Sequence, residues 1–87
     1  MELSIAANAI AATLAEVGEA PEGILYAGLM TKGGSLEEFH AVKTWLLVVG
    51  LAEEASGPVL VATPRLLAVH KKAMEGKSNV LARDQAG

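Results

Sequence analysis

Residues 34–54 read GSLEEFHAVKTWLLVVGLAEE, and this stretch decides the fold. Ser35 and Glu38 have the S-x-x-E spacing of a capping box, in which serine and glutamate satisfy each other's free backbone donors at a helix start. Apolar residues then recur at helical spacing, and Gly50 suits the left-handed end of a helix. The pattern predicts a helix between Ser35 and Gly50 with an inward stripe of Leu36, Phe39, Val42, Leu46 and Val49.

After this helix the sequence predicts two short strands around a turn. Residues 51–54 and 59–63 are the strands, and the connection 55–58, which contains Gly and Pro, suits a hairpin. Thr63 and Pro64 then suit the cap and first turn of a further helix. The apolar stripe expected for that helix is Leu66, Leu67, Val69, His70, Ala73 and Met74.

Two boundaries follow from the loss of periodicity near the end of the chain. Gly76 is expected to stop the last helix. The domain therefore covers residues 1–76, and residues 77–87 are interpreted as a disordered tail.

Before the capping box, the spacing predicts two more helices. The first covers about Ser4–Val17 and ends at Gly18. The second has Pro21 in its first turn, where a missing N–H costs nothing, and Lys32-Gly33-Gly34 breaks it. Its expected buried stripe is Ile24, Leu25, Leu29 and Met30.

The order helix–helix–helix–hairpin–helix resembles that of the winged-helix family. GSLEEF entering a helix and LLVVGLAEE leaving it for a hairpin resemble the recognition helix, exit and wing of that family. ATPR at 62–65 resembles its T-x-x-G helix start, with Leu66 or Leu67 in place of the usual glycine. The resemblance covers residues 4–75. It implies a mostly α fold with a small β-hairpin: a winged-helix-like three-helix core plus a wing and a C-terminal helix. A fold shared this widely implies architecture more than function.

Composition narrows the class of protein. A chain of 87 residues makes one domain with a thin stability margin, and with no cysteine it has neither disulfides nor thiolate zinc sites. A partner chain is the remaining source of extra stability. The longest apolar run, Trp45–Val49, is far too short to cross a bilayer, and the N-terminus lacks the basic start of a signal peptide. We therefore expect a cytoplasmic protein with no membrane partner.

The residues suited to catalysis do not cluster in the sequence. His40 and His70 fall on different predicted helices, and the pairs Glu37-Glu38 and Glu53-Glu54 point apart on a helix or a strand. Gly33-Gly34 lacks the spacing and the lysine of a phosphate-binding loop. We expect no catalytic residue, no cofactor and no metal, and therefore not an enzyme.

The outer face of the 36–49 helix separates two binding hypotheses. It carries Ala41, Trp45 and Val48, an apolar patch opposite the core stripe. Either another helix of the same chain covers Trp45, or a second chain does. The favoured hypothesis is a homodimeric protein-interaction or regulatory domain with these three residues at the contact.

The alternative is a DNA-binding transcriptional regulator. Against it, the outer face offers no Lys or Arg for phosphates, and residues 1–64 carry two basic and eight acidic side chains, a net charge of −6. Residues 65–87 carry five basic and two acidic side chains, a net charge of +3. The contacts that this alternative would use are Lys32, His40, Lys43, Thr44, Lys71 and Lys72, together with Lys77 and Arg83 of the tail.

Overall fold

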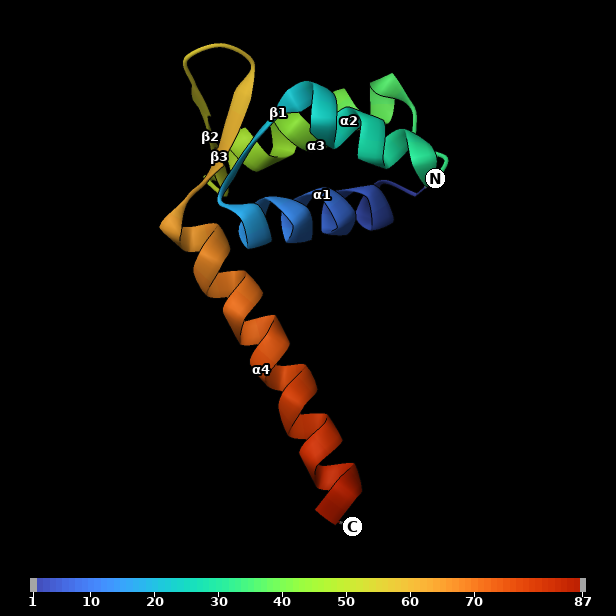
Figure 1. Ribbon diagram of the computed structural model, residues 1–87, viewed down its shortest axis with the longest axis vertical. Helices are drawn as coiled ribbons and strands as arrows, with labels where there is room; N and C mark the ends of the chain where they lie inside the picture. The colour runs from blue at the N-terminus through green and yellow to red at the C-terminus, as the bar shows by residue number, and fades with distance from the viewer. Residues whose placement is uncertain (1, 87) are drawn as a thin grey trace.

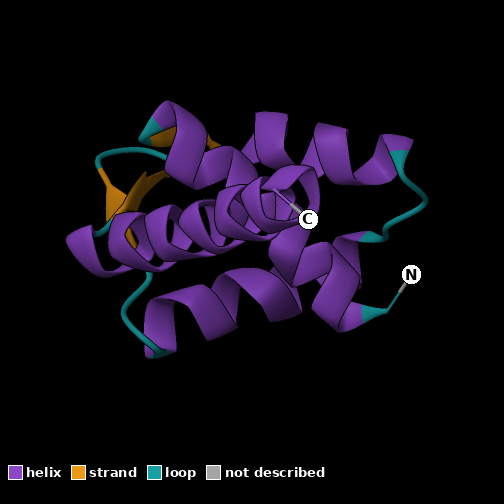
Figure 2. Cartoon of the chain, turned by 90° about the horizontal axis from the view of Figure 1, so that it is seen from below, coloured by secondary structure: helices purple, strands orange, loops and turns teal. Residues whose placement is uncertain are grey.

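The computed structural model describes the backbone of residues 2–86 and the side chains of residues 2–75. This part of the chain forms four helices and a three-stranded antiparallel sheet, so the fold is mostly α. The sheet lies at one end of the helices (Figure 2). The elements are α1 (Leu3–Val17), β1 (Glu19–Pro21), α2 (Glu22–Thr31), α3 (Leu36–Val48), β2 (Ala52–Ala55), β3 (Val59–Ala62) and α4 (Pro64–Ala86).

Both ends of α3 form as the sequence predicts. The backbone N–H of Ser35 donates to Glu38 Oε1 at 2.8 Å, and the N–H of Glu38 donates to Ser35 Oγ at 3.2 Å. These two bonds confirm the capping box. At the other end, Gly50 has a φ of 79°, which turns the chain out of the helix. The N–H of Leu51 then donates to the carbonyl of Leu46 at 2.9 Å.

The predicted hairpin is confirmed, but it is part of a larger sheet. β3 lies in the centre, with β2 on one edge and β1 on the other. Glu19 of β1 and Glu53 of β2 both lie opposite Val61. The sequence did not predict β1, because three residues carry no period of their own and this strand forms only by pairing with β3. Pro21 ends β1 and precedes α2, so its predicted place in the first turn of that helix is wrong by one residue.

The core lies where α1, α2 and α3 meet one another and the inner face of the sheet. Its largest fully buried side chains are Leu14, Leu46 and Leu60, one from each of α1, α3 and β3. The buried apolar set is Ala6, Ile10, Leu14, Ala20, Leu25, Leu29, Phe39, Val42, Leu46, Ala52, Leu60 and Leu66.

Several residues predicted to be buried are exposed. Ile24 and Met30 flank the buried Leu25 and Leu29 on α2, and both face solvent. Leu36 is also exposed because it stands at the first residue of α3, where no neighbouring element covers it. Periodicity identifies an apolar face, but the width of the covered strip depends on how closely the neighbouring helices approach.

The start of α4 is fastened to the end of α3. Thr63 Oγ1 accepts from the N–H of Leu66 at 3.3 Å, which confirms the predicted cap, and donates to the carbonyl of Gly50 at 2.7 Å. Arg65 Nη1 donates to the carbonyl of Val49 at 3.0 Å. The bonds to Gly50 and Val49 satisfy carbonyls just after the end of α3, and the bond from Leu66 satisfies a free N–H at the start of α4.

Beyond its first turns, α4 departs from the prediction. It continues through Gly76 to Ala86, and it points away from the other helices (Figure 1). The predicted stop at Gly76 is therefore wrong, because one glycine costs a helix only about 1 kcal/mol. The side chains of residues 77–87 lie outside the described part, and their interpretation as a separate tail stays a prediction. Of the stripe predicted for α4, only Leu66 is buried; Leu67, Val69, Ala73 and Met74 are exposed, and His70 is half-buried.

Candidate functional site

The outer face of α3 carries the apolar patch that the sequence predicts. Ala41 is exposed, the Trp45 side chain is 47% exposed and Val48 is 79% exposed. The helix turns these residues outward because Val42 and Leu46, their neighbours in sequence, take the buried positions. The chain's own helices thus leave about half of Trp45 uncovered.

The Trp45 groove runs between this face and α1, and its volume is about 360 Å³. Trp45 and Ala41 line one wall, and side chains of α1, among them the short Ser4 and Ala7, line the other. Alanine-rich helices leave such space because their side chains are short. The sequence did not assign the α1 wall to a site, although its alanine content was the available signal. The lining is Leu3, Ser4, Ala7, Asn8, Ala41, Val42 and Trp45.

The α1–α4 groove is larger, at about 620 Å³, and lies between α1 and the diverging α4. Asn8 lines both this groove and the Trp45 groove, so the two adjoin along α1. One acidic side chain, Glu16, lies in it. Its lining is Asn8, Ala11, Ala12, Glu16, Leu66, Val69, His70, Ala73 and Met74.

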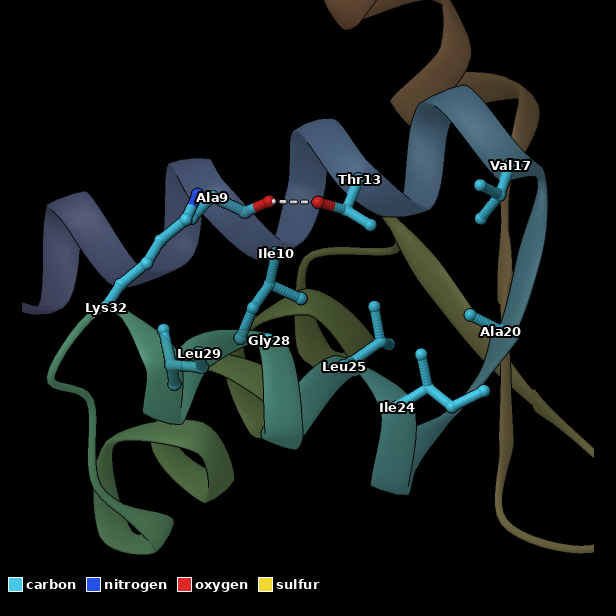
Figure 3. A pocket seen from close by; sticks show the side chains of 10 residues that line it. All are labelled: Ala9, Ile10, Thr13, Val17, Ala20, Ile24, Leu25, Gly28, Leu29 and Lys32. Atoms are coloured by element: carbon cyan, nitrogen blue, oxygen red, sulfur yellow. Dashed lines mark hydrogen bonds between the residues drawn. The ribbon is translucent and has the colours of Figure 1, made fainter.

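A third groove separates α1 from α2 and has a volume of about 160 Å³ (Figure 3). The Thr13 hydroxyl donates to the carbonyl of Ala9 at 2.9 Å, so its proton is used within α1. Lys32 lies at one end, and Ile24 and Val17 lie near the other. The rest of the lining is apolar, so Lys32 is the one charged side chain among the described residues along this groove.

Lys43, which the DNA alternative requires, is held by two carboxylates. Its Nζ lies 2.8 Å from Glu22 Oε1 and 3.9 Å from Glu54 Oε1. The hydrogen bond that Lys43 donates to Glu22 raises the pKa of Lys43 above its ordinary value; partial burial opposes this shift, and the negative charges of Glu22 and Glu54 add to it. The positive charge of α3 is thus neutralised by the chain's own acids.

The other residues of the DNA alternative lie on three elements. Lys32 follows α2, whereas His40 and Thr44 are exposed on α3. Lys71 and Lys72 are exposed on α4, and Lys71 Nζ lies 4.0 Å from Glu75 Oε1. Of the three grooves, only the α1–α2 groove is lined by any member of this set, namely Lys32. The structure therefore does not gather them at one groove.

The carboxylates Glu53 and Glu54 of the hairpin diverge, as the sequence predicts. Glu53 lies opposite Val61 and Glu54 opposite Leu60, so they occupy opposite faces of β2. Over the residues with described side chains, no three His, Cys, Asp or Glu residues are placed to hold a metal ion. Within the same part of the chain, no helix has the length and apolar character needed to cross a membrane.

No family model, curated protein or solved structure matches this chain. Its function is therefore inferred from its residues and their geometry.

Proposed function

We propose that this chain is a non-catalytic binding module on a winged-helix-like fold, and that it forms a homodimer through the exposed face of α3. One observation carries the proposal: Trp45 is half exposed beside an apolar groove of about 360 Å³, with the more exposed Val48 one turn further on. Tryptophan is enriched at the centres of protein interfaces, and exposed apolar patches mark interaction sites.

The order of the elements supports the winged-helix part of the proposal. Three helices precede a hairpin, and a further helix follows it. The strand β1, between the first two helices, adds to the edge of the hairpin to give the order β1-β3-β2. In this arrangement α3 corresponds to the recognition helix, and the turn at 55–58 corresponds to the tip of the wing.

A second copy of the chain is the partner that best accounts for the free energy available from covering Trp45. Covering the remaining half of an indole removes on the order of 100 Å² from water, which contributes about 2.5 kcal/mol at ~25 cal/mol per Å². In a dimer with a two-fold axis this stabilisation occurs twice, once for the Trp45 of each copy. For a domain of 87 residues without cysteines, that is a large part of the available stability.

DNA is the less favoured partner because of the charges around α3. Its single Lys or Arg side chain, Lys43, is bound to Glu22, and Glu37 is exposed near the start of the helix. Phosphate contacts depend on free Lys and Arg side chains. The wing does not compensate, since Glu53 and Glu54 are exposed on β2 and the turn 55–58 holds no basic residue.

The test compares the mass in solution of the wild type, Trp45→Ala and Ile24→Ala by sedimentation equilibrium. Ile24 is a matched control because it is a large exposed apolar residue on α2, outside the Trp45 groove. We expect a dimer for the wild type and for Ile24→Ala. Trp45→Ala should raise the dissociation constant roughly tenfold or more and give a monomer with unchanged helix content by circular dichroism. A wild-type monomer at high protein concentration, or an unfolded Trp45→Ala chain, would contradict the proposal.

A further inference from the structure

The long helix α4 has an apolar side that its own chain leaves bare. Leu67, Val69 and Met74 are each at least 44% exposed, and only Leu66 of the predicted stripe is buried. α4 has 23 residues, and beyond its first turns it points away from the other helices (Figure 1). Helices in proteins gain most of their stability by burying one face. Packing of another surface against this face would therefore stabilise α4.

The charges of α1 and α4 are opposite in sign. α1 carries one charged side chain, Glu16, which lines the α1–α4 groove. Residues 64–75 of α4 carry three Lys or Arg and one Glu, a net charge of +2. Among the side chains of residues 2–75, neither Glu16 nor Lys72 forms an ion pair. Each copy of the chain therefore presents one acidic side chain in the groove and a helix of net positive charge, and these two features are complementary.

The lengths of the two helices fit the two adjoining grooves. At about 1.5 Å per residue, α1 is about 22 Å long and α4 about 35 Å. The α1–α4 groove lies along the C-terminal half of α1, the Trp45 groove lies along its N-terminal half, and Asn8 joins them. A helix as long as α4 can therefore lie along α1 and reach Trp45.

From these observations we infer that the occupant of the α1–α4 groove is α4 of a second copy. The two α4 helices cross at a two-fold axis, each lies on the α1 of the other copy, and Lys72 of each faces Glu16 of the other. This inference rests on the proposed homodimer and names the segment that closes it. The α1 floor of Ala11 and Ala12 allows close approach, and the incoming helix replaces water in the groove.

Charge reversal tests the contact directly. Glu16→Lys and Lys72→Glu should each raise the dissociation constant of the dimer about tenfold, because each places like charges at both contacts. In an equal mixture of the two variants, both contacts of a mixed dimer again join opposite charges. We therefore expect the mixture to associate as tightly as the wild type by sedimentation equilibrium.

Cross-linking gives a second readout, since the chain has no cysteine of its own. Ala12→Cys and Ala73→Cys variants, mixed and oxidised, should give more disulfide-linked dimer on a non-reducing gel than either variant oxidised alone. Ala27→Cys, exposed on α2, is the matched control; mixed with Ala73→Cys, it should add no linked dimer beyond that of Ala73→Cys alone. If the wild type is a dimer but the mixture is not rescued and the cross-link is no stronger than the control, the inference is wrong and the proposed homodimer stands. If the wild type is a monomer, both the inference and the proposed homodimer are wrong.

Discussion

Lys43 Nζ lies 2.8 Å from Glu22 Oε1, so the only lysine or arginine of α3 is held by the first residue of α2. This ion pair links α2 to α3. Glu54 of β2 also lies near Lys43, with its Oε1 3.9 Å from the same Nζ. Both members of the closer pair are largely shielded, with side chains 24% and 16% exposed. Lys43 therefore has a structural role.

The Lys43 ion pair should make stability depend on alkaline pH. The pKa of Lys43 is raised above 10.5 in the folded chain, so the stabilisation is fully present below pH 10.5 and is lost as the pH rises through the raised value. We expect Lys43→Gln to lower the free energy of unfolding by roughly 0.5–1 kcal/mol at neutral pH. Thermal unfolding at increasing pH should show this difference shrink. Lys32→Gln, at an exposed lysine just after α2, is the control and should leave the unfolding midpoint at neutral pH unchanged.

The capping box makes a second contribution to the stability of the folded chain, and this one weakens at acidic pH. Ser35→Ala removes the side chain that accepts from the N–H of Glu38, and we expect a loss of about 1 kcal/mol in thermal unfolding. Ser56→Ala, in the hairpin turn, is the control and should have little effect. An unchanged midpoint for Ser35→Ala would show that the cap does not stabilise α3.

Glu38, the other half of the capping box, sets the pH dependence of this contribution. The backbone hydrogen bond from Ser35 lowers the pKa of Glu38 below 4.5, and the Ser35 hydroxyl adds to the shift. The stabilisation is therefore present above pH 4.5 and is lost as the pH falls through the lowered value. In Glu38→Gln this acid-dependent loss should be smaller than in the wild type, as acid unfolding curves can show.

Features encoded by neighbouring residues were predictable from the sequence. The cap of α3, its end at Gly50, the hairpin turn and the Thr63 cap of α4 each depend on a few adjacent residues, and each forms as predicted. In each cap a side chain satisfies a free backbone group a few residues away, so these features can be predicted without knowing the rest of the fold.

Features that depend on distant partners were not predictable. β1 exists because Glu19 meets Val61, which follows it by more than forty residues. Lys43 looked available in the sequence, because nothing local shows that Glu22 will lie beside it. The apolar periodicity of α4 predicted a buried face, but periodicity alone does not show which other surface packs against that face. Of the candidate site, Ala41, Trp45 and Val48 were found in advance, while the α1 wall of Ser4, Ala7 and Asn8 was not.

The turn between α2 and α3 allows a paired test with two glycines. A Cβ added to Gly34 would collide with Cγ of Leu29, a core residue, so we expect Gly34→Ala to cost about 1–3 kcal/mol. Gly28 lies within α2, and a Cβ there meets nothing within 4 Å. Gly28→Ala should therefore stabilise the chain, by up to about 1 kcal/mol through helix propensity. Urea unfolding measures both; equal effects of the same sign would contradict this account of the turn.

The charge distribution predicts how the chain behaves with DNA. We expect no sequence-specific binding by the body of the domain, because Lys43 is held by Glu22 and the hairpin carries the exposed acids Glu53 and Glu54. Residual affinity should follow the basic end of the chain, which holds Lys71 and Lys72, and also Lys77 and Arg83, whose side chains lie outside the described part. Raising the salt from about 50 mM to about 200 mM should abolish it, since non-specific binding depends on counterion release.

Two variants separate non-specific attraction from true recognition in a fluorescence anisotropy titration with duplex DNA. Lys71→Gln removes a side chain that is 78% exposed and should weaken binding and flatten the salt dependence. Lys43→Gln should leave both unchanged, because the ion pair with Glu22 already withholds that charge from phosphates. The reverse pattern, with tight binding that survives physiological salt and is lost in Lys43→Gln, would mean that Lys43 leaves Glu22 on contact with DNA. In that case α3 would be a recognition helix, and the regulator hypothesis would replace the dimerisation module.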